Sequence, residues 1–159
     1  MNQQCKLYVL VGVPGSGKST WVSNQDWAKD CTYVSTDMWV EMEAERVGKT
    51  YSEIFTEYMP KAVELMARQV ELARDINQDI IWDQTSTTLA SRTRKFNMLP
   101  DYYKIAVVFR TPEHKELMRR LVSRWDSGKI IPEHVVASMI ASWEEPTEEE
   151  GFDEIWYAS

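Results

Sequence analysis

The sequence predicts an α/β fold in which a mostly parallel sheet of about five strands is covered by helices on both faces. Short apolar, β-branched runs alternate along the chain with longer segments in which apolar residues recur at helical spacing. The 159 residues, 43% of them hydrophobic, allow one sizeable core and are too few for two ordinary domains. We therefore expect a single domain over residues 1–159.

Five apolar runs are expected to form the strands. Residues 7–11 and 105–109 are the clearest, because they are uninterrupted and rich in valine, leucine and isoleucine. The last run is expected at an edge of the sheet. The other three predicted strands span residues 31–35, 79–83 and 154–157.

Helices are expected between these strands. In the longest, Pro60 predicts either a kink or the start of a separate segment. Pro112 and Pro132 each stand at a helix start, where a missing N–H group does no harm. The acidic run at residues 144–150 is expected to be an exposed loop before the last strand. The predicted helices span residues 19–23, 38–47, 54–77, 91–99, 112–125 and 132–143.

Residues 12–19 read Gly-Val-Pro-Gly-Ser-Gly-Lys-Ser, which matches G-x-x-x-x-G-K-S/T between a predicted strand and a predicted helix. The glycines let backbone N–H groups converge on phosphate oxygens, next to the positive end of the helix. The sequence thus predicts a P-loop NTPase or kinase fold that binds ATP and Mg²⁺. The expected nucleotide contacts in this loop are Gly15, Ser16, Gly17, Lys18, Ser19 and Thr20, with Lys18 at the terminal phosphates and Ser19 on the metal.

Asp37 and Asp83 follow the second and third predicted strands. Ligands of an open parallel sheet bind beyond the carboxyl ends of its strands, so both carboxylates are expected at the nucleotide. Asp37 is expected to orient an acceptor hydroxyl or take its proton, a role that phosphoryl transfer to alcohols requires. Asp83 is expected to bind the Mg²⁺ ion or its waters, together with Ser19. A helix cap or loop acid is the alternative for each.

Arg120 and Arg124 stand one helical turn apart in the segment before a break at residues 126–129. Guanidinium groups suit the charge that develops during phosphoryl transfer, and a helix before a flexible break can close as a lid. We expect both arginines at the nucleotide, with Arg124 catalytic alongside Lys18 and Asp37. The alternative is an ordinary solvated helix face.

A net charge of −7 and a pI near 4.9 argue against binding nucleic acid through the whole surface. A local basic groove is still compatible with this charge. Two clusters of cations are candidates for it, and the alternative for each is a solvated helix face. They comprise Arg92, Arg94 and Lys95, and then Arg110, Lys115, Arg119, Arg120, Arg124 and Lys129.

The chain has seven tryptophans, and an aromatic face can hold a nucleobase by stacking. Trp39, two residues after Asp37, is the best placed for contact with a substrate. Trp82 and Trp156 lie in predicted strands and are expected in the core. Packing in the core is the alternative for Trp39 as well.

No apolar run is long enough to cross a membrane, and the N-terminal residues lack the apolar core of a secretory signal. Cys5 and Cys31 allow at most one disulfide and are more typical of reduced thiols. These observations predict a cytoplasmic protein. Nothing in the sequence indicates an obligate protein partner.

The chain resembles the kinase domain of bacteriophage polynucleotide 5′-hydroxyl kinases over most of its length. The resemblance is strongest at residues 12–21 and weaker at residues 35–37, at residues 80–83 and at the Arg120 and Arg124 pair. It implies that Asp37 is the general base, that Lys18 and Ser19 contact nucleotide and metal, and that the two arginines belong to a lid. The nucleic acid would be the substrate.

A second resemblance and one departure qualify this assignment. Residues 80–85, 132–134 and 152–155 are similar to the nucleotide-binding domain of heterogeneous nuclear ribonucleoprotein U, which implies that the scaffold need not be a kinase. The phage kinases usually carry an arginine three positions after the catalytic aspartate, for the phosphate beside the acceptor; this chain has Val40.

We therefore expect an ATP-dependent phosphotransferase acting on a hydroxyl of a nucleic acid, with a polynucleotide 5′ end as the first acceptor. One alternative is a phage DNA-modification kinase that phosphorylates 5-hydroxymethyluracil, because an aromatic site suits a flipped base. A nucleoside or small-molecule kinase is another. The third is a nucleotide- or RNA-binding module without turnover.

Overall fold

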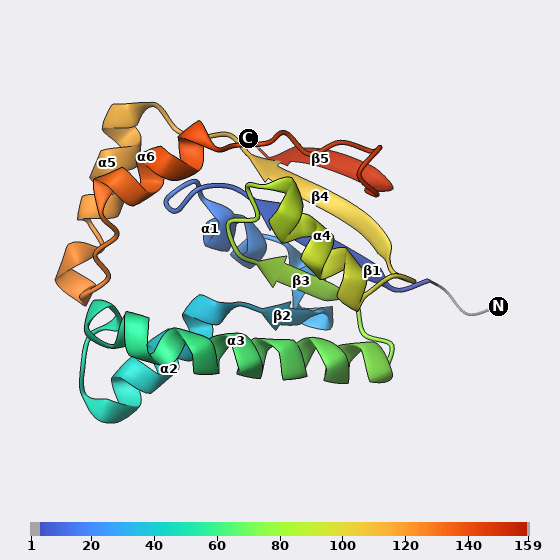
Figure 1. Cartoon of the computed structure of the whole chain (residues 1–159), viewed down its shortest axis with the longest axis horizontal. Helices are drawn as coiled ribbons and strands as arrows, with labels where there is room; N and C mark the ends of the chain where they lie inside the picture. Colours follow the sequence, from blue (N-terminus) through green and yellow to red (C-terminus); the bar gives the residue numbers. More distant parts are fainter. Residues whose placement is uncertain (1–3, 159) are drawn as a thin grey trace.

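The computed structural model describes residues 4–158, so the first three residues of the N-terminal segment considered above lie outside it. Five parallel strands form one sheet in the order β2-β3-β1-β4-β5 (Figure 1). The predicted parallel α/β sheet is confirmed. Its strands are β1 (Lys6–Val11), β2 (Thr32–Val34), β3 (Ile80–Asp83), β4 (Tyr103–Phe109) and β5 (Glu154–Ala158).

Alternate residues of the central strand pack on opposite faces of the sheet. Leu7 and Val9 join a core that includes residues of α3 (Tyr51–Asp75) and α4 (Leu89–Met98). Tyr8 and Leu10 join a second core that includes residues of α1 (Lys18–Ser23) and the 3-10 helix η1 (Asp26–Asp30). Both faces are therefore covered, because a strand buried on both sides needs apolar partners above and below it.

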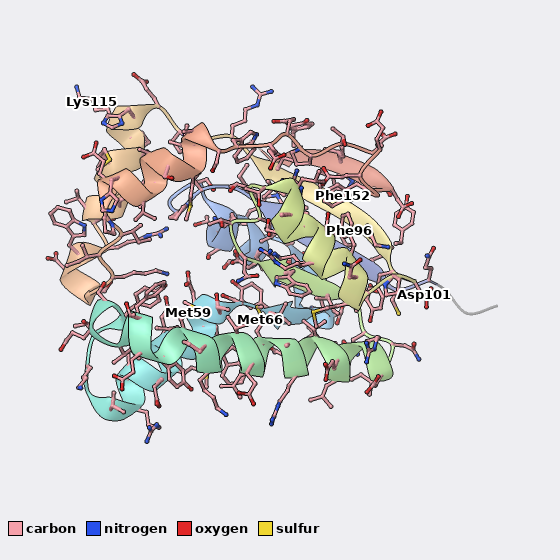
Figure 2. All side chains as sticks on the ribbon, viewed as in Figure 1. Met59, Met66, Phe96, Asp101, Lys115 and Phe152 are labelled. Carbon is pink, nitrogen blue, oxygen red and sulfur yellow. The ribbon has the colours of Figure 1, made fainter. Side chains whose placement is uncertain are left out.

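Two helices pack against each other along the β2 edge of the sheet. Helix α2 (Thr36–Val47) begins two residues earlier than expected, since the Ser35 hydroxyl accepts a hydrogen bond from the Met38 amide and caps it. Helix α3 is continuous through Pro60, so the predicted separate segment does not occur. Figure 2 shows Met59 and Met66 on the side of α3 that faces the sheet. The apolar packing of α3 outweighs the one backbone hydrogen bond that proline removes.

The segment after β4 folds into two shorter helices, α5 (His114–Val122) and α6 (Glu133–Ala141), with a 3-10 turn η2 (Trp125–Ser127) between them. Figure 1 shows α5 and α6 beyond the carboxyl ends of the strands, facing the junction of α2 and α3. We call residues 114–141 the lid segment. Helix α5 ends before Arg124, which changes where that arginine points.

The acidic run is not wholly an exposed loop, and two of the three cations of the first basic cluster, Arg92 and Lys95, are buried. The Arg92 side chain is 1% exposed and the Glu150 side chain 5% exposed, and they form a two-pronged ion pair with Nε to Oε2 at 2.8 Å. Arg92 also donates to the Ser86 carbonyl at 2.9 Å. This pair joins α4 to the segment before β5, where Phe96 and Phe152 also meet edge to face (Figure 2).

Replacing Glu150 by alanine should lower the free energy of unfolding by about 3–5 kcal/mol, because a buried guanidinium would lose its counterion. Urea unfolding measures this change. Glu149→Ala, at an exposed neighbouring position, is the matched control and should change stability by less than about 0.5 kcal/mol. Equal effects of the two variants would show that the ion pair does not hold β5 in place.

Lys95 is also buried, although no carboxylate lies within ion-pair distance of it in residues 4–158. Its ammonium group donates to the Ser91 carbonyl at 3.3 Å and lies 5.4 Å from the centre of the Trp82 ring. Burial, with smaller contributions from Arg94 and Arg92, lowers the pKa of Lys95 to about 8. The fold therefore opposes the charged form of this lysine.

Lys95→Met should stabilise the protein at pH 7 by about 2 kcal/mol. Below pH 8 the native state carries the cost of the buried charge, and above the unfolded pKa of about 10.4 the lysine is neutral in both states. The advantage of the variant should therefore shrink as the pH rises from 8 to 10. Urea midpoints across this range test it, with Lys49→Met at an exposed site as the control. A stability difference between Lys95→Met and the original protein that stays constant over this pH range would contradict the lowered pKa of Lys95.

Candidate functional site

A cavity of about 650 Å³ lies at the carboxyl ends of β1, β2 and β3. Its lining comes from the phosphate loop (residues 12–19), the ends of β2 and β3, the start of α2, the first turns of α3 and the lid segment. Its charged lining residues are three cations and three carboxylates, namely Lys18, Arg124, Lys129, Asp37, Glu41 and Asp83. This is the edge of a parallel sheet at which ligands are expected.

The phosphate loop has the conformation that its glycines permit. Gly15 and Gly17 have φ angles of +84° and +100°, which other residues rarely adopt. The Lys18 ammonium donates to the carbonyls of Gly12 at 2.8 Å and Val13 at 3.0 Å. The Ser16 hydroxyl is buried and has no hydrogen-bond partner among the described residues. These features fit a triphosphate, which would provide acceptors for the hydroxyl and for Lys18.

Two buried groups of the cavity, Lys18 and Asp83, have shifted pKa values. Burial lowers the pKa of Lys18 to about 8, and the charges of Asp83 and Asp37 oppose this shift. Burial raises the pKa of Asp83, while a hydrogen bond from Tyr33 and the charge of Lys18 act in the opposite direction. A triphosphate and a divalent cation would each offer the countercharge that these two groups need.

Ser19 and Asp83 lie side by side, as the metal prediction requires. The Ser19 hydroxyl is 3.5 Å from Asp83 Oδ2, and the Tyr33 hydroxyl donates to the same carboxylate. Oxygen ligands of this kind suit Mg²⁺, which normally keeps several waters and phosphate oxygens in its coordination sphere. The donor set therefore fits Mg²⁺, and Ser19 and Asp83 are the residues that would hold it.

Asp37 lies in the first turn of α2 and faces the cavity. The Tyr51 hydroxyl donates to its Oδ1 at 2.6 Å, and the Lys129 ammonium contacts its Oδ2 at 3.0 Å. The Asp37 side chain is still 47% exposed, so it can accept a further hydrogen bond. Asp37 was predicted from the sequence, whereas its partner Tyr51 was not, and Lys129 was named only as a member of a basic cluster. These partners lie 14 and 92 residues from Asp37 and belong to no motif.

Of the two predicted arginines, only one lines the cavity. Arg124 lines the cavity, close enough to Lys18 to lower its pKa. Arg120 lies outside the lining, donating to the Gly15 carbonyl at 3.0 Å and to Glu116 at 2.9 Å. They diverge because α5 ends at Val122. Arg120 thus supports the phosphate loop from behind.

Trp39 is not brought to the cavity, in contrast to its prediction as a substrate contact. It packs between the core under the sheet and the cluster at the α2–α3 junction. It points away from the cavity because Asp37, Met38 and Glu41 take the cavity-facing side of α2, which leaves Trp39 on the side that packs against the core. The aromatic side chains that line the cavity are Tyr33, Tyr51 and Phe55.

The lid segment is docked on the start of α3. The Ser52 amide donates to the Gly128 carbonyl at 3.2 Å, and the Ser52 hydroxyl receives a hydrogen bond from the Ile130 amide at 2.8 Å. Gly128 has a φ of +82°, and a Cβ atom there would lie 2.5 Å from the Thr50 side chain. Only glycine allows this close approach.

Gly128→Ala should release the lid segment from α3, because the added methyl group meets Thr50 and the left-handed backbone is strained. Hydrogen exchange should then increase by about tenfold or more at residues 124–131 and stay unchanged in the sheet. Gly48→Ala is the control, since Gly48 also has a positive φ but its Cβ would meet no atom within 4 Å. Unchanged exchange in the lid segment would argue against a docked lid.

A second hollow lies at the other half of the sheet, beside the carboxyl ends of β4 and β5. Its lining includes Arg110, from the second basic cluster, together with Trp143 and Tyr157, which the sequence had not indicated for a site. Because β1 stands between β3 and β4, the phosphate loop separates the two halves.

A family model described as an AAA domain, AAA_33, matches residues 7–146. The chain belongs to the AAA_33 family of AAA domains. The match includes the phosphate loop, both carboxylates and the lid segment.

The curated relatives of this AAA_33 chain include the heterogeneous nuclear ribonucleoprotein U-like protein 2 of Mus musculus. The two are 24% identical over 167 residues, which cover 98% of this chain and 22% of that protein. The human protein of the same name is 25% identical with the same coverage. The chain thus spans about a fifth of the length of these relatives.

Solved structures share the fold. A Chloroflexus aurantiacus protein provisionally described as a kinase has a TM-score of 0.73 and 15% identity, covering 99% of this chain and 86% of its own. A chain of the Pnkp1/Rnl/Hen1 RNA repair complex has a TM-score of 0.67 and 23% identity, and the match covers 89% of this chain and 45% of that chain. A sugar kinase from Janibacter has a TM-score of 0.62 and 16% identity, and the match covers 96% of this chain and 85% of that chain.

These comparisons identify a P-loop kinase-like domain, as the sequence predicted. The finer resemblance to phage polynucleotide kinases stays a prediction. Within residues 4–158, no helix is both long and apolar enough to span a membrane.

Proposed function

We propose that this protein is an ATP-dependent phosphotransferase that moves the γ-phosphate to a hydroxyl group of a nucleic acid. The observation that carries the proposal is the position of Asp37, whose half-exposed carboxylate faces the same cavity as the phosphate loop. A carboxylate aimed at an incoming alcohol is the element that a kinase needs and a simple nucleotide-binding module does not.

The proposed reaction balances in one step. The acceptor oxygen forms a bond to the γ-phosphorus, the bond from that phosphorus to the β,γ-bridging oxygen breaks, and ADP leaves. Asp37 accepts the proton of the acceptor hydroxyl. Tyr51 holds Oδ1 of the carboxylate by its hydrogen bond and so orients Oδ2 and its free lone pairs.

Cations would stabilise the transferred group. Lys18 would exchange its two carbonyl contacts for oxygens of the terminal phosphates, and Arg124 lies near enough to share them. Mg²⁺, held through Ser19 and Asp83, supplies charge neutralisation at the phosphates when bound. The second hollow, with Trp143 and Arg110, is a suitable place for the base of ATP.

A polynucleotide 5′ end is the first candidate acceptor. Both the resemblance of the motifs to the phage kinases and the fold shared with a chain of the Pnkp1/Rnl/Hen1 RNA repair complex favour it. The geometry gives a reason for a second candidate. Val40 is fully buried at the α2–α3 junction, so it cannot make the phosphate contact for which those kinases use an arginine at this position.

The second candidate is the hydroxymethyl group of a modified pyrimidine such as 5-hydroxymethyluracil in DNA. The aromatic residues beside Asp37 support it: Tyr51 and Phe55 lie 5.4 Å apart between ring centres, and Tyr33 lines the same cavity. A flipped base is held by stacking of this kind.

The test offers γ-labelled ATP with two acceptors, a 5′-hydroxyl oligonucleotide and a 5′-blocked duplex that contains hydroxymethyluracil. Label on the first supports a 5′-end kinase, and label on the second supports a base kinase. Label on neither, with ATP bound, would reject a nucleic acid acceptor and leave a nucleoside, a sugar or no acceptor at all.

Asp37→Asn should reduce the rate of transfer by about 10²–10⁴-fold, because the amide cannot take the proton. The affinity for ATP should stay within about threefold, which separates loss of the base from loss of the nucleotide site. Asp101→Asn, at an exposed position at the opposite end of the molecule (Figure 2), is the matched control. Near-normal turnover by Asp37→Asn would remove Asp37 from the role of general base.

A further inference from the structure

The three cations that line the cavity are divided between its two sides. Lys18 holds the phosphate loop and Arg124 lies near it, so these two cations belong to the triphosphate side. We call the part lined by α2, α3 and residues 128–131 the acceptor compartment. Lys129 is the one cation that the described residues contribute to its lining.

Two carboxylates share the charge of Lys129. Its Nζ atom lies 3.0 Å from Asp37 Oδ2 and 3.2 Å from Glu41 Oε1, and 4.7 Å from the centre of the Tyr51 ring. The Lys129 side chain is only 15% exposed, so most of its surface lies against these neighbours. The acceptor compartment therefore carries one net negative charge before any ligand enters.

Glu41 is the source of that excess. It stands one helical turn after Asp37 on α2, and its side chain is 55% exposed at the rim of the compartment. The proposed chemistry does not need it, since Asp37 accepts the proton and Tyr51 orients Asp37. The rest of the lining here is uncharged and mostly apolar, including Met38, Phe55, Met59 and Ile130.

We propose that Glu41 is a specificity-determining residue that excludes acceptors with a phosphate beside the reacting hydroxyl. The compartment then selects a hydroxyl carried on an uncharged, largely apolar or aromatic body. This inference rests on the phosphotransferase function proposed above. Of the two acceptors considered there, it favours the hydroxymethyl group of a base, because the backbone phosphates lie farther from a flipped base than from a 5′ hydroxyl.

The net charge of the acceptor compartment would repel a phosphate. A phosphate a few ångströms from the Asp37–Glu41–Lys129 group would meet a net negative charge in a partly enclosed site, where repulsion between like charges is worth at least a tenfold change in affinity. Removing the charge of Glu41 would leave Lys129 balanced by Asp37 alone. The repulsion should then largely disappear.

The experiment uses acceptors that differ only in one charge. Each acceptor, the 5′-hydroxyl oligonucleotide and the hydroxymethyluracil duplex, is prepared with a phosphodiester or an uncharged methylphosphonate at the linkage nearest the hydroxyl. For the 5′-hydroxyl pair, kcat/KM should be about tenfold or more higher with the methylphosphonate. The hydroxymethyluracil pair should differ by less than about threefold.

Glu41→Gln should reduce the 5′-hydroxyl ratio to about threefold or less, by raising kcat/KM for the phosphodiester form. Glu45→Gln is the matched control, because it removes the same charge from an exposed position on the same helix. It should leave the ratio unchanged. Equal urea midpoints of the two variants establish that both are folded.

A preference for the phosphodiester form, or a ratio that Glu41→Gln does not change, would overturn the proposal. If no acceptor is labelled, the proposed function fails, and the selection is then tested by binding alone. Thymidine and thymidine 3′-phosphate are titrated into the protein saturated with Mg²⁺ and a non-hydrolysable ATP analogue. Tighter binding of the phosphate would reject the role of Glu41, whereas tighter binding of thymidine that Glu41→Gln removes would support it.

Discussion

The parallel pairing of the five strands is the constraint on which the rest of the structure depends. Because every strand runs in one direction, all carboxyl ends meet at one edge, and the loops that follow them converge there. With β1 in the centre, the phosphate loop has β3 and β2 on one side and β4 and β5 on the other. The acidic side chains of the cavity and the second hollow thus fall on opposite sides of the phosphates.

The lid segment turns this open edge into a cavity. Its attachment to α3 depends on two contacts with Ser52 and on the absence of a side chain at Gly128. Lys129 then reaches Asp37 and Glu41 across the opening. The same contacts enclose this part of the cavity and set its charge, so its shape and the selectivity proposed for it have one physical origin.

The core could be predicted in outline and its buried charges could not. Apolar periodicity located every strand and most helices, since these elements bury residues at regular spacing. It failed at Arg92, Lys95 and Glu150, which look like ordinary solvated charges in the sequence. Arg92 and Glu150 are buried because they lie opposite each other across α4 and the segment before β5, 58 residues apart.

The candidate site likewise contains residues whose positions the sequence predicts and residues whose positions it does not. The phosphate loop is a contiguous motif, so its conformation and the position of Lys18 follow from local chemistry, and Asp37 and Asp83 follow from the rule that ligands bind at the ends of parallel strands. Trp39, Tyr51 and Lys129 have no such signal. Whether each side chain enters the cavity depends on how α2 rotates against α3 and where α5 ends.

The sequence by itself determined the order of the elements, the phosphate loop and the two carboxylates beside it, because these depend on local conformation and on strand direction. Only the tertiary structure decided that Val40 is buried, that Arg120 and Arg124 separate, and that Glu41 shares Lys129 with Asp37. Those features depend on packing between segments that are distant in the chain, which no local pattern records.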